Sequence, residues 1–263
     1  MKKASLLFLL LIVLSACDRK GRATPVVFKK PIVVQMPFED SVQYLSYNFM
    51  SGSYPEFIGK SPFSDTLTMT VGGLLYFEDK DLVFPEHEHI DVTDTTRTDG
   101  LELFPDYASA IVRNYHSDTC ANYYYPVYIV NQTSGIKVIS AKDGHLFGIQ
   151  EALDTNGNWR PIEFQGHDFC GVGRYGVKLY PKEYAVLIFP KYQGSFKTKL
   201  RVRIKNGENI YVSQPFDGTI NERQFYFEKD EYLRKEMLRY KAEIIESTFY
   251  GAMPIEADNA FVK

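Results

Sequence analysis

The chain has 263 residues, of which 44% are hydrophobic and 24% are charged. This composition excludes a chain that is disordered throughout and supplies enough apolar side chains for one large or two small domains. The formal net charge of −3 gives no general reason to expect nucleic acid as a partner. Aromatic residues make up 15% of the chain, with 19 Tyr and 19 Phe beside one Trp, which favours strands that pack on one face and meet water on the other.

The first seventeen residues have the pattern of a secretory signal. Lys2 and Lys3 precede an apolar run from Leu6 to Leu14, which leads into Ser15-Ala16-Cys17. A membrane-crossing helix needs about 20 apolar residues, so the short run favours a signal peptide over residues 1–16 rather than a transmembrane anchor. The Leu-Ser-Ala-Cys ending resembles the lipobox of bacterial lipoproteins.

In that family the cysteine receives a diacylglycerol, the chain is cut before it, and the new amino terminus is usually acylated as well. The resemblance implies that Cys17 is lipidated and that the mature protein is held on a membrane of the cell envelope. The N-terminal composition and the aromatic-rich strands are similar to those of lipoproteins of the Bacteroidota. This resemblance implies attachment to the outer membrane, on either its periplasmic or its surface side. Cleavage also removes Lys2 and Lys3, so 28 basic residues remain against 33 acidic ones, a net charge of −5.

Two further cysteines, Cys120 and Cys170, form an even pair in a compartment where disulfides persist. A bridge between them would stabilise the fold by roughly 4 kcal/mol in the chain-entropy model. Two buried free thiols are the alternative. We favour the bridge, and spacing alone does not show whether the two Cα atoms approach closely enough.

The N-terminal part of the mature chain divides into two segments. Residues 17–30 are polar and without period, which indicates a tether. Residues 31–100 contain strand-like patches at Ile32–Val34, Thr66–Val71 and Leu74–Phe77, interrupted by prolines and glycines. They predict a small β-rich region.

Residues 101–225 carry the clearest pattern, because short apolar or alternating runs recur about every ten residues between Asp-Gly and Asn-Gly turn signals. The pattern predicts an antiparallel β-sandwich, which resembles an immunoglobulin-like sandwich in strand count and spacing only. Tyr184–Phe189 is apolar throughout and is expected at the centre of the core. The predicted strands are 124–130, 136–140, 146–153, 159–164, 175–179, 184–189, 197–205 and 210–213.

The last segment, residues 226–263, changes to a helical period. Leu233, Met237, Tyr240 and Ile244 repeat at four, three and four residues, which predicts an amphipathic helix over Glu228–Glu246. Its polar face mixes acidic and basic residues, so packing on the sandwich is favoured over a membrane-surface role. Gly251–Lys263 is expected to be a loose tail.

One predicted strand carries a basic stripe. Period-two alternation points Leu200, Val202 and Ile204 toward the core and five cations outward: Lys197, Lys199, Arg201, Arg203 and Lys205. Such a stripe can attract an anionic glycan, lipid phosphates or an acidic protein surface. The alternative, which we favour, is a solvated strand face whose charges meet acidic neighbours.

Motifs for catalysis or metal binding are weak. Glu151 and Glu163 are a candidate carboxylate pair for sugar hydrolysis, although a chain with 33 acidic residues offers many such pairs. His87 and His89 suit zinc on a strand, but a solvated acidic loop explains them more simply. We therefore expect no cofactor and no metal.

The sequence predicts a mainly β, lipid-anchored envelope protein that acts by binding, in adhesion, assembly or ligand capture. Its expected partners are the membrane, other envelope proteins and anionic glycans, without nucleic acid. The alternatives are a glycan-binding module of a surface uptake system and a hydrolase with dispersed acidic residues.

Overall fold

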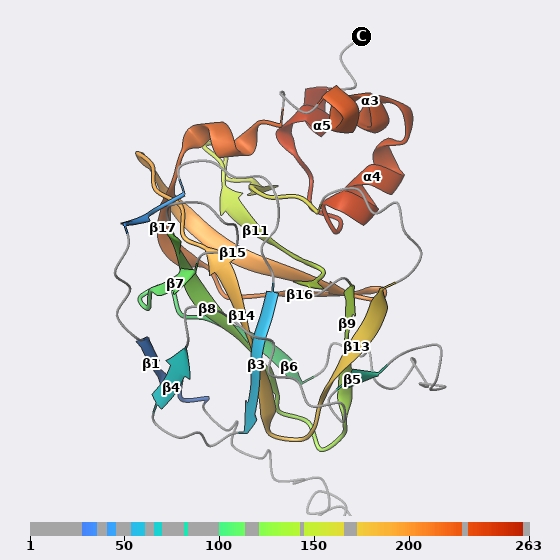
Figure 1. Ribbon diagram of the computed structural model, residues 1–263. Coiled ribbons are helices and arrows are strands. Elements are labelled where there is room, and N and C mark those ends of the chain that lie inside the picture. The colour runs from blue at the N-terminus through green and yellow to red at the C-terminus, as the bar shows by residue number, and fades with distance from the viewer. Residues whose placement is uncertain are drawn as a thin grey trace, which may run out of the picture.

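The computed structural model describes residues 28–35, 41–45, 54–60, 66–69, 82–83, 100–113, 121–142, 145–165, 173–227 and 231–259. In these residues the protein is mainly β, built from antiparallel sheets with a small helical region at the C-terminal end (Figure 1), as the sequence predicted. The cysteines Cys17, Cys120 and Cys170, the histidines His87 and His89 and the expected strand 74–77 lie outside the described residues.

The largest sheet has six strands in the order β2-β8-β14-β3, with β6 and β7 also paired to β8. All its pairs are antiparallel except β2 with β8. Its members are β2 (Val42–Gln43), β3 (Tyr54–Lys60), β6 (Leu101–Pro105), β7 (Ile111–Arg113), β8 (Ala121–Asn131) and β14 (Glu183–Pro190).

A second, wholly antiparallel sheet contains β11 (Gly148–Leu153), β12 (Trp159–Pro161), β15 (Phe196–Asn206), β16 (Asn209–Val212) and β17 (Phe216–Ile220). A third contains β5 (Leu82–Val83), β9 (Lys137–Lys142), β10 (His145–Leu146) and β13 (Arg174–Leu179). The short strands β1 (Ile32–Gln35) and β4 (Thr66–Met69) form a separate parallel pair.

Strand β14 is the centre of the core, as its unbroken apolar sequence predicted. Every one of its residues is buried, and β3 and β8 are hydrogen-bonded to its two sides. Ala185, Leu187 and Phe189 join the main core, whereas Tyr184 and Val186 pack on the opposite face with Phe28 and Ile111. An apolar run without alternation therefore marks a strand that is covered on both faces.

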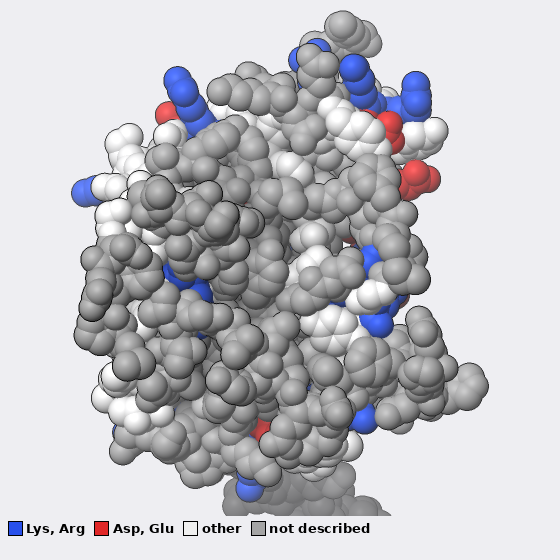
Figure 2. Space-filling view, viewed as in Figure 1, with Lys and Arg blue, Asp and Glu red and all other residues white. Residues whose placement is uncertain are grey.

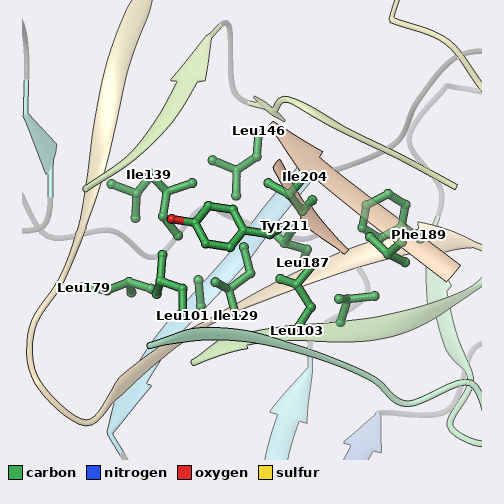
Figure 3. Packing of buried hydrophobic residues seen from close by; sticks show 14 of the residues in the cluster. Leu101, Leu103, Ile129, Ile139, Leu146, Leu179, Leu187, Phe189, Ile204 and Tyr211 are labelled. Atoms are coloured by element: carbon green, nitrogen blue, oxygen red, sulfur yellow. The ribbon is translucent and has the colours of Figure 1, made fainter. Parts of the chain in front are cut away.

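The main core lies where the three larger sheets meet. It combines side chains of β6, β8, β9, β10, β13, β14, β15 and β16. Figure 3 shows the ring of Tyr211 from β16 lying among Leu101, Ile139 and Leu146, which come from three different strands. The five-stranded sheet is thereby packed against the other two, which is the layered arrangement expected of a sandwich.

Seven of the eight strands predicted between residues 124 and 213 have one counterpart each, although β12 covers only the first half of 159–164. The predicted strand 146–153 is broken at Phe147 into β10 and β11, which belong to different sheets. The sequence missed β2, β3, β5, β6, β7 and β17, which have two to seven residues each. Three strands from residues 31–100 join the sheets of the sandwich. Strand β2 is hydrogen-bonded to β8, β3 to β14, and β5 to β13. The expected β-rich region is therefore continuous with the sandwich in backbone pairing.

The C-terminal region contains η2 (Glu222–Phe225), α3 (Glu231–Arg239), α4 (Lys241–Thr248) and α5 (Ile255–Asn259). The predicted single helix is broken at Tyr240, where φ is −133° and ψ is 46°, outside the α region. Tyr240 is consequently exposed, although the periodicity placed it on the apolar stripe.

The predicted packing of this region on the sandwich is confirmed. Leu233, Met237 and Ile244 are buried in one cluster with Ile149 of β11 and with Phe249. Lys and Arg side chains project over this end of the molecule with acidic ones beside them (Figure 2), the mixed surface that the sequence indicated. We call residues 231–259 the helical cap.

The expectation of a loose tail after Gly251 is wrong for residues 251–259. Ala252 and Ala257 are buried in the same cluster as the helices, and α5 covers part of that segment. Small side chains allow this close packing, and two isolated alanines form no apolar period that would have revealed it in the sequence.

Candidate functional site

The basic stripe of β15 has the alternation that the sequence predicted. Leu200, Val202 and Ile204 are almost completely buried, and the five cations point to the opposite face of the sheet. Strand β15 lies between β11 on one side and β16 and β17 on the other, so its neighbours decide which cations remain open.

At the C-terminal end of the stripe the cations are neutralised. Arg201 donates two hydrogen bonds to Glu151, from Nε to Oε2 at 2.7 Å and from Nη2 to Oε1 at 3.2 Å. Arg203 donates from Nη2 to the same Oε1 at 3.3 Å, and Lys205 pairs with Glu246 of the helical cap. The Arg201 guanidinium also lies over the Trp159 ring, 4.2 Å from its centroid.

At the N-terminal end the stripe is open. Lys199 forms an ion pair of 2.8 Å with Asp217 of β17, but 49% of the Lys199 side chain and 87% of the Asp217 side chain remain exposed. Lys197 is exposed and has no acidic partner among the residues that the structure describes. The interpretation in which acidic neighbours meet the charges therefore holds for four of the five cations.

These two lysines border a hollow of about 740 Å³, which we call the lysine groove. It forms where β15 and β17 extend beyond the end of β11. The Thr198 hydroxyl links β15 to the end of β11 by donating a hydrogen bond of 2.6 Å to the Leu153 carbonyl. The described residues that line the lysine groove are Tyr107, Leu153, Lys197, Thr198, Lys199, Asp217, Gly218 and Thr219.

Gly218, which lines the groove, leaves room for the buried Leu200 side chain. A Cβ atom at this position would lie 2.4 Å from Leu200 Cδ1 and 2.9 Å from its Cγ. Because Leu200 is itself buried, its side chain has little room to move away. A side chain at position 218 would therefore displace the groove wall or the core beneath it.

Tyr107 forms a fixed aromatic wall of the lysine groove. Its ring contacts Tyr125 edge-on at 5.0 Å and Phe216 at 5.1 Å, and Lys191 Nζ lies 4.7 Å from its centroid. Burial raises the pKa of the Tyr107 hydroxyl, which a hydrogen bond with the Thr219 backbone partly opposes. The hydroxyl is accordingly neutral at physiological pH.

The two glutamates proposed as a hydrolytic pair do not converge. Glu151 follows Gln150 in β11, so their side chains point to opposite faces of the sheet. Glu163 accepts hydrogen bonds from the Gln150 side chain at 2.7 Å and from the Tyr192 hydroxyl at 2.5 Å, which places it on the core face. Glu151 is held by two arginines on the other face, so this pair does not support glycoside hydrolysis.

Glu163 is nevertheless unusual, because it is fully buried and no cation is bonded to it among the described residues. Burial raises its pKa from 4.5 to about 7, against hydrogen bonds from Tyr192 and Gln150 that lower it. The Gln150 side chain also accepts from the Tyr125 hydroxyl at 2.7 Å. The carboxylate, the amide and the two phenols form a connected polar network inside the core.

The sequence located the lysines of the groove but missed Tyr107, Asp217 and Thr219. Asp217 and Thr219 belong to β17, whose alternation is interrupted by Gly218, so the strand signal was too weak to recognise. Tyr107 follows β6 in a turn and is brought to the groove by tertiary packing alone.

No family model matches the chain, and a search of curated proteins found no significant relative. Within the described ranges, no helix has both the length and the apolar character required to span a bilayer.

Proposed function

We propose that the protein is a lipid-anchored component of the bacterial envelope that acts by binding, without a cofactor, and that the lysine groove captures an anionic glycan. The observation that carries the proposal is the exposed ammonium of Lys197, which has no acidic partner in the described part of the chain and stands beside a hollow of about 740 Å³. A hollow of this size accommodates an oligosaccharide of a few units.

The chemistry of the groove favours a carbohydrate that carries acidic groups. Lys197 and Lys199 attract carboxylate, sulfate or phosphate groups, and their exposure lets a ligand reach them without a large desolvation cost. Asp217 is an exposed acceptor for sugar hydroxyls, and Tyr107 provides an aromatic wall. A purely apolar ligand would leave these polar groups unpaired.

Binding can be followed through Trp159, the one tryptophan of the chain. Trp159 is the cross-strand partner of Leu153, a residue of the groove, so a ligand there should change its fluorescence. We would titrate the protein without its lipid anchor with oligosaccharides that contain uronic acids or sulfate. Raising the salt from about 0.05 M to about 0.5 M should weaken binding, because the Debye length falls roughly threefold.

The decisive variant is Lys197→Ala with Lys199→Ala, which should weaken binding by about tenfold. The matched control is Arg174→Gln with Lys182→Gln, which removes the same number of charges from β13 and the turn that follows it. Equal losses in both double variants, or binding that is insensitive to salt, would contradict a specific role for the groove.

The anchor is tested separately. In the Cys17→Ser variant the lipid attachment atom is lost, so the protein should leave the membrane fraction and appear without lipid mass. A variant that still partitions with membranes as before would refute the anchoring part of the proposal and leave the groove unaffected.

A further inference from the structure

A second hollow, distinct from the lysine groove, lies between an edge of the six-stranded sheet and an edge of the five-stranded sheet. Its volume is about 590 Å³, and we call it the edge groove. Its described lining comes from β6, from β16 and the segment that follows it, and from Lys30. Strands β6 and β16 are each paired on one side only in the described part of the chain.

The free edge of β16 follows from the hydrogen bonds of its other side. In an antiparallel pair, alternate residues direct both backbone groups toward the partner strand. Ser213 N donates to Val202 O, so Tyr211 and Asn209 also bond to β15. Ile210 and Val212 consequently direct their N–H and C=O groups away from β15, where no described residue bonds to them.

Strand β6 has the same arrangement but is partly blocked. The bonds from Gln132 N to Gly100 O and from Asp106 N to Pro126 O show that its even-numbered residues bond to β8. The backbone N–H and C=O groups of its odd-numbered residues therefore point away from β8, toward the edge groove. Among these, Pro105 has no N–H, and its carbonyl already accepts a hydrogen bond from Lys30 Nζ at 3.1 Å.

Apart from its short length of four residues, the edge of β16 lacks the features that usually protect an edge strand. Its sequence, Asn209-Ile210-Tyr211-Val212, contains no lysine, proline or bulge. Val212 is 41% exposed, and Ile210 is half-buried. Exposed β-branched side chains beside unpaired backbone groups favour the addition of another strand.

We propose that the edge groove binds an extended peptide segment of a partner protein, which adds to β16 as a further strand. A row of donors and acceptors that repeats every second residue is complementary to another extended backbone, and to few small molecules. The hollow is walled by β6 as well as by β16, so a narrow extended segment suits it better than the broad sheet edge of a second copy. Alternate apolar residues of the peptide contact Ile210 and Val212.

The test uses the whole mature protein and a phage-displayed library of random peptides about twelve residues long. Peptides selected on the protein should alternate apolar and polar residues. Val212→Pro removes the outward N–H without breaking a bond to β15, since proline is tolerated where the N–H faces away from a sheet. Binding of the selected peptides should fall at least tenfold. Val212→Ala, which keeps the N–H, should reduce binding much less.

Amide hydrogen exchange provides the second readout. In the free protein the amides of Ile210 and Val212 should exchange rapidly, and a selected peptide should protect both. Protection in the free protein that grows with protein concentration would show a second copy on the edge, and protection at all concentrations would show that the chain covers it itself. Either result, or a selection in which Val212→Pro has no effect, would overturn the proposal. Loss of the lysines of the lysine groove should leave this binding unchanged.

Discussion

The two ends of strand β15 carry the same alternating sequence of cations and yet differ in what surrounds them. At the Arg201–Lys205 end, Glu151 and the helical cap cover the charges, whereas at the Lys197–Lys199 end the sheet face is open. The difference arises from segments far away in the sequence, since Glu151 lies 50 residues from Arg201 and Glu246 lies 41 residues from Lys205. The neighbours of a basic stripe therefore decide whether its charges are paired within the structure or left open to solvent.

The largest expected effect is on the covered end. Phe249 is fully buried in the helical cap against Phe164 and Phe227. Phe249→Ala should lower the free energy of unfolding by roughly 3 to 5 kcal/mol, measured by urea denaturation. Leu238→Ala, on the exposed face of the same cap, should cost less than about 0.5 kcal/mol. Similar small losses in both variants would mean that the cap is not part of the folded core.

Glu163 sharpens the comparison, because it is a buried carboxylate without the cations that Glu151 has. Its pKa is about 7 in the folded protein and near 4.5 when unfolded. Between these values the folded state keeps a proton that the unfolded state has lost, so stability is greatest below about pH 4.5 for this group and falls as the pH rises toward 7. The loss is roughly 3 kcal/mol.

Urea unfolding at a series of pH values measures this dependence. Glu163→Gln cannot titrate and should remove the slope in that window, whatever its effect on the absolute stability. If the slope persists in the variant, other groups are responsible and the burial of Glu163 is not its cause.

Glu151 is the direct test of the covered end. Glu151→Gln leaves Arg201 and Arg203 without their carboxylate and should cost roughly 2 to 3 kcal/mol of unfolding free energy. This is less than for a fully buried pair, because 19% and 15% of the two arginine side chains remain exposed. The control is Asp217→Asn at the open end, which should cost less than about 0.5 kcal/mol. Equal costs would abolish the distinction between the two ends.

The smallest effect on stability is expected for Lys197. Lys197→Ala should change the free energy of unfolding by less than about 0.5 kcal/mol, because the side chain is exposed and makes no ion pair in the described part of the structure. A substantial loss of stability would show that Lys197 supports the fold, and its proposed role in binding would then need another explanation.

The sequence predicted the sandwich because its strongest signals are local. The Gly207-Glu208 turn, flanked by the paired residues Asn206 and Asn209, fixes the register of β15 with β16, and the apolar run of β14 marks the centre of the core. Tyr240 and Ala257 were misjudged for the opposite reason. Tyr240 is exposed because the helix breaks there, and Ala257 is buried because α5 packs against the other helices of the cap. Neither the break nor the packing can be read from the hydrophobic periodicity.

The candidate site was predictable in part. Alternation placed Lys197 and Lys199 on the outer face, but Asp217, Tyr107 and the hollow itself arise from the pairing of β15 with β17 and from the contact with the turn after β6. The sequence left two alternatives for Arg201, pairing with an acidic neighbour or exposure to an anionic ligand. It could not identify Glu151 as the acidic neighbour, because the chain contains 33 acidic residues.

The position of β14 between β3 and β8 also determines at what stage of synthesis the six-stranded sheet can be completed. Residues 54–60 hydrogen-bond to residues 183–188, so more than a hundred intervening residues must be spanned before this pairing contributes any stability. A chain that emerges from a ribosome or a membrane channel amino end first can pair β2, β6 and β7 with β8, but it cannot complete this sheet until about residue 190 is released. Folding is consequently a late and cooperative event, and fragments that stop before β14 should be degraded by proteases.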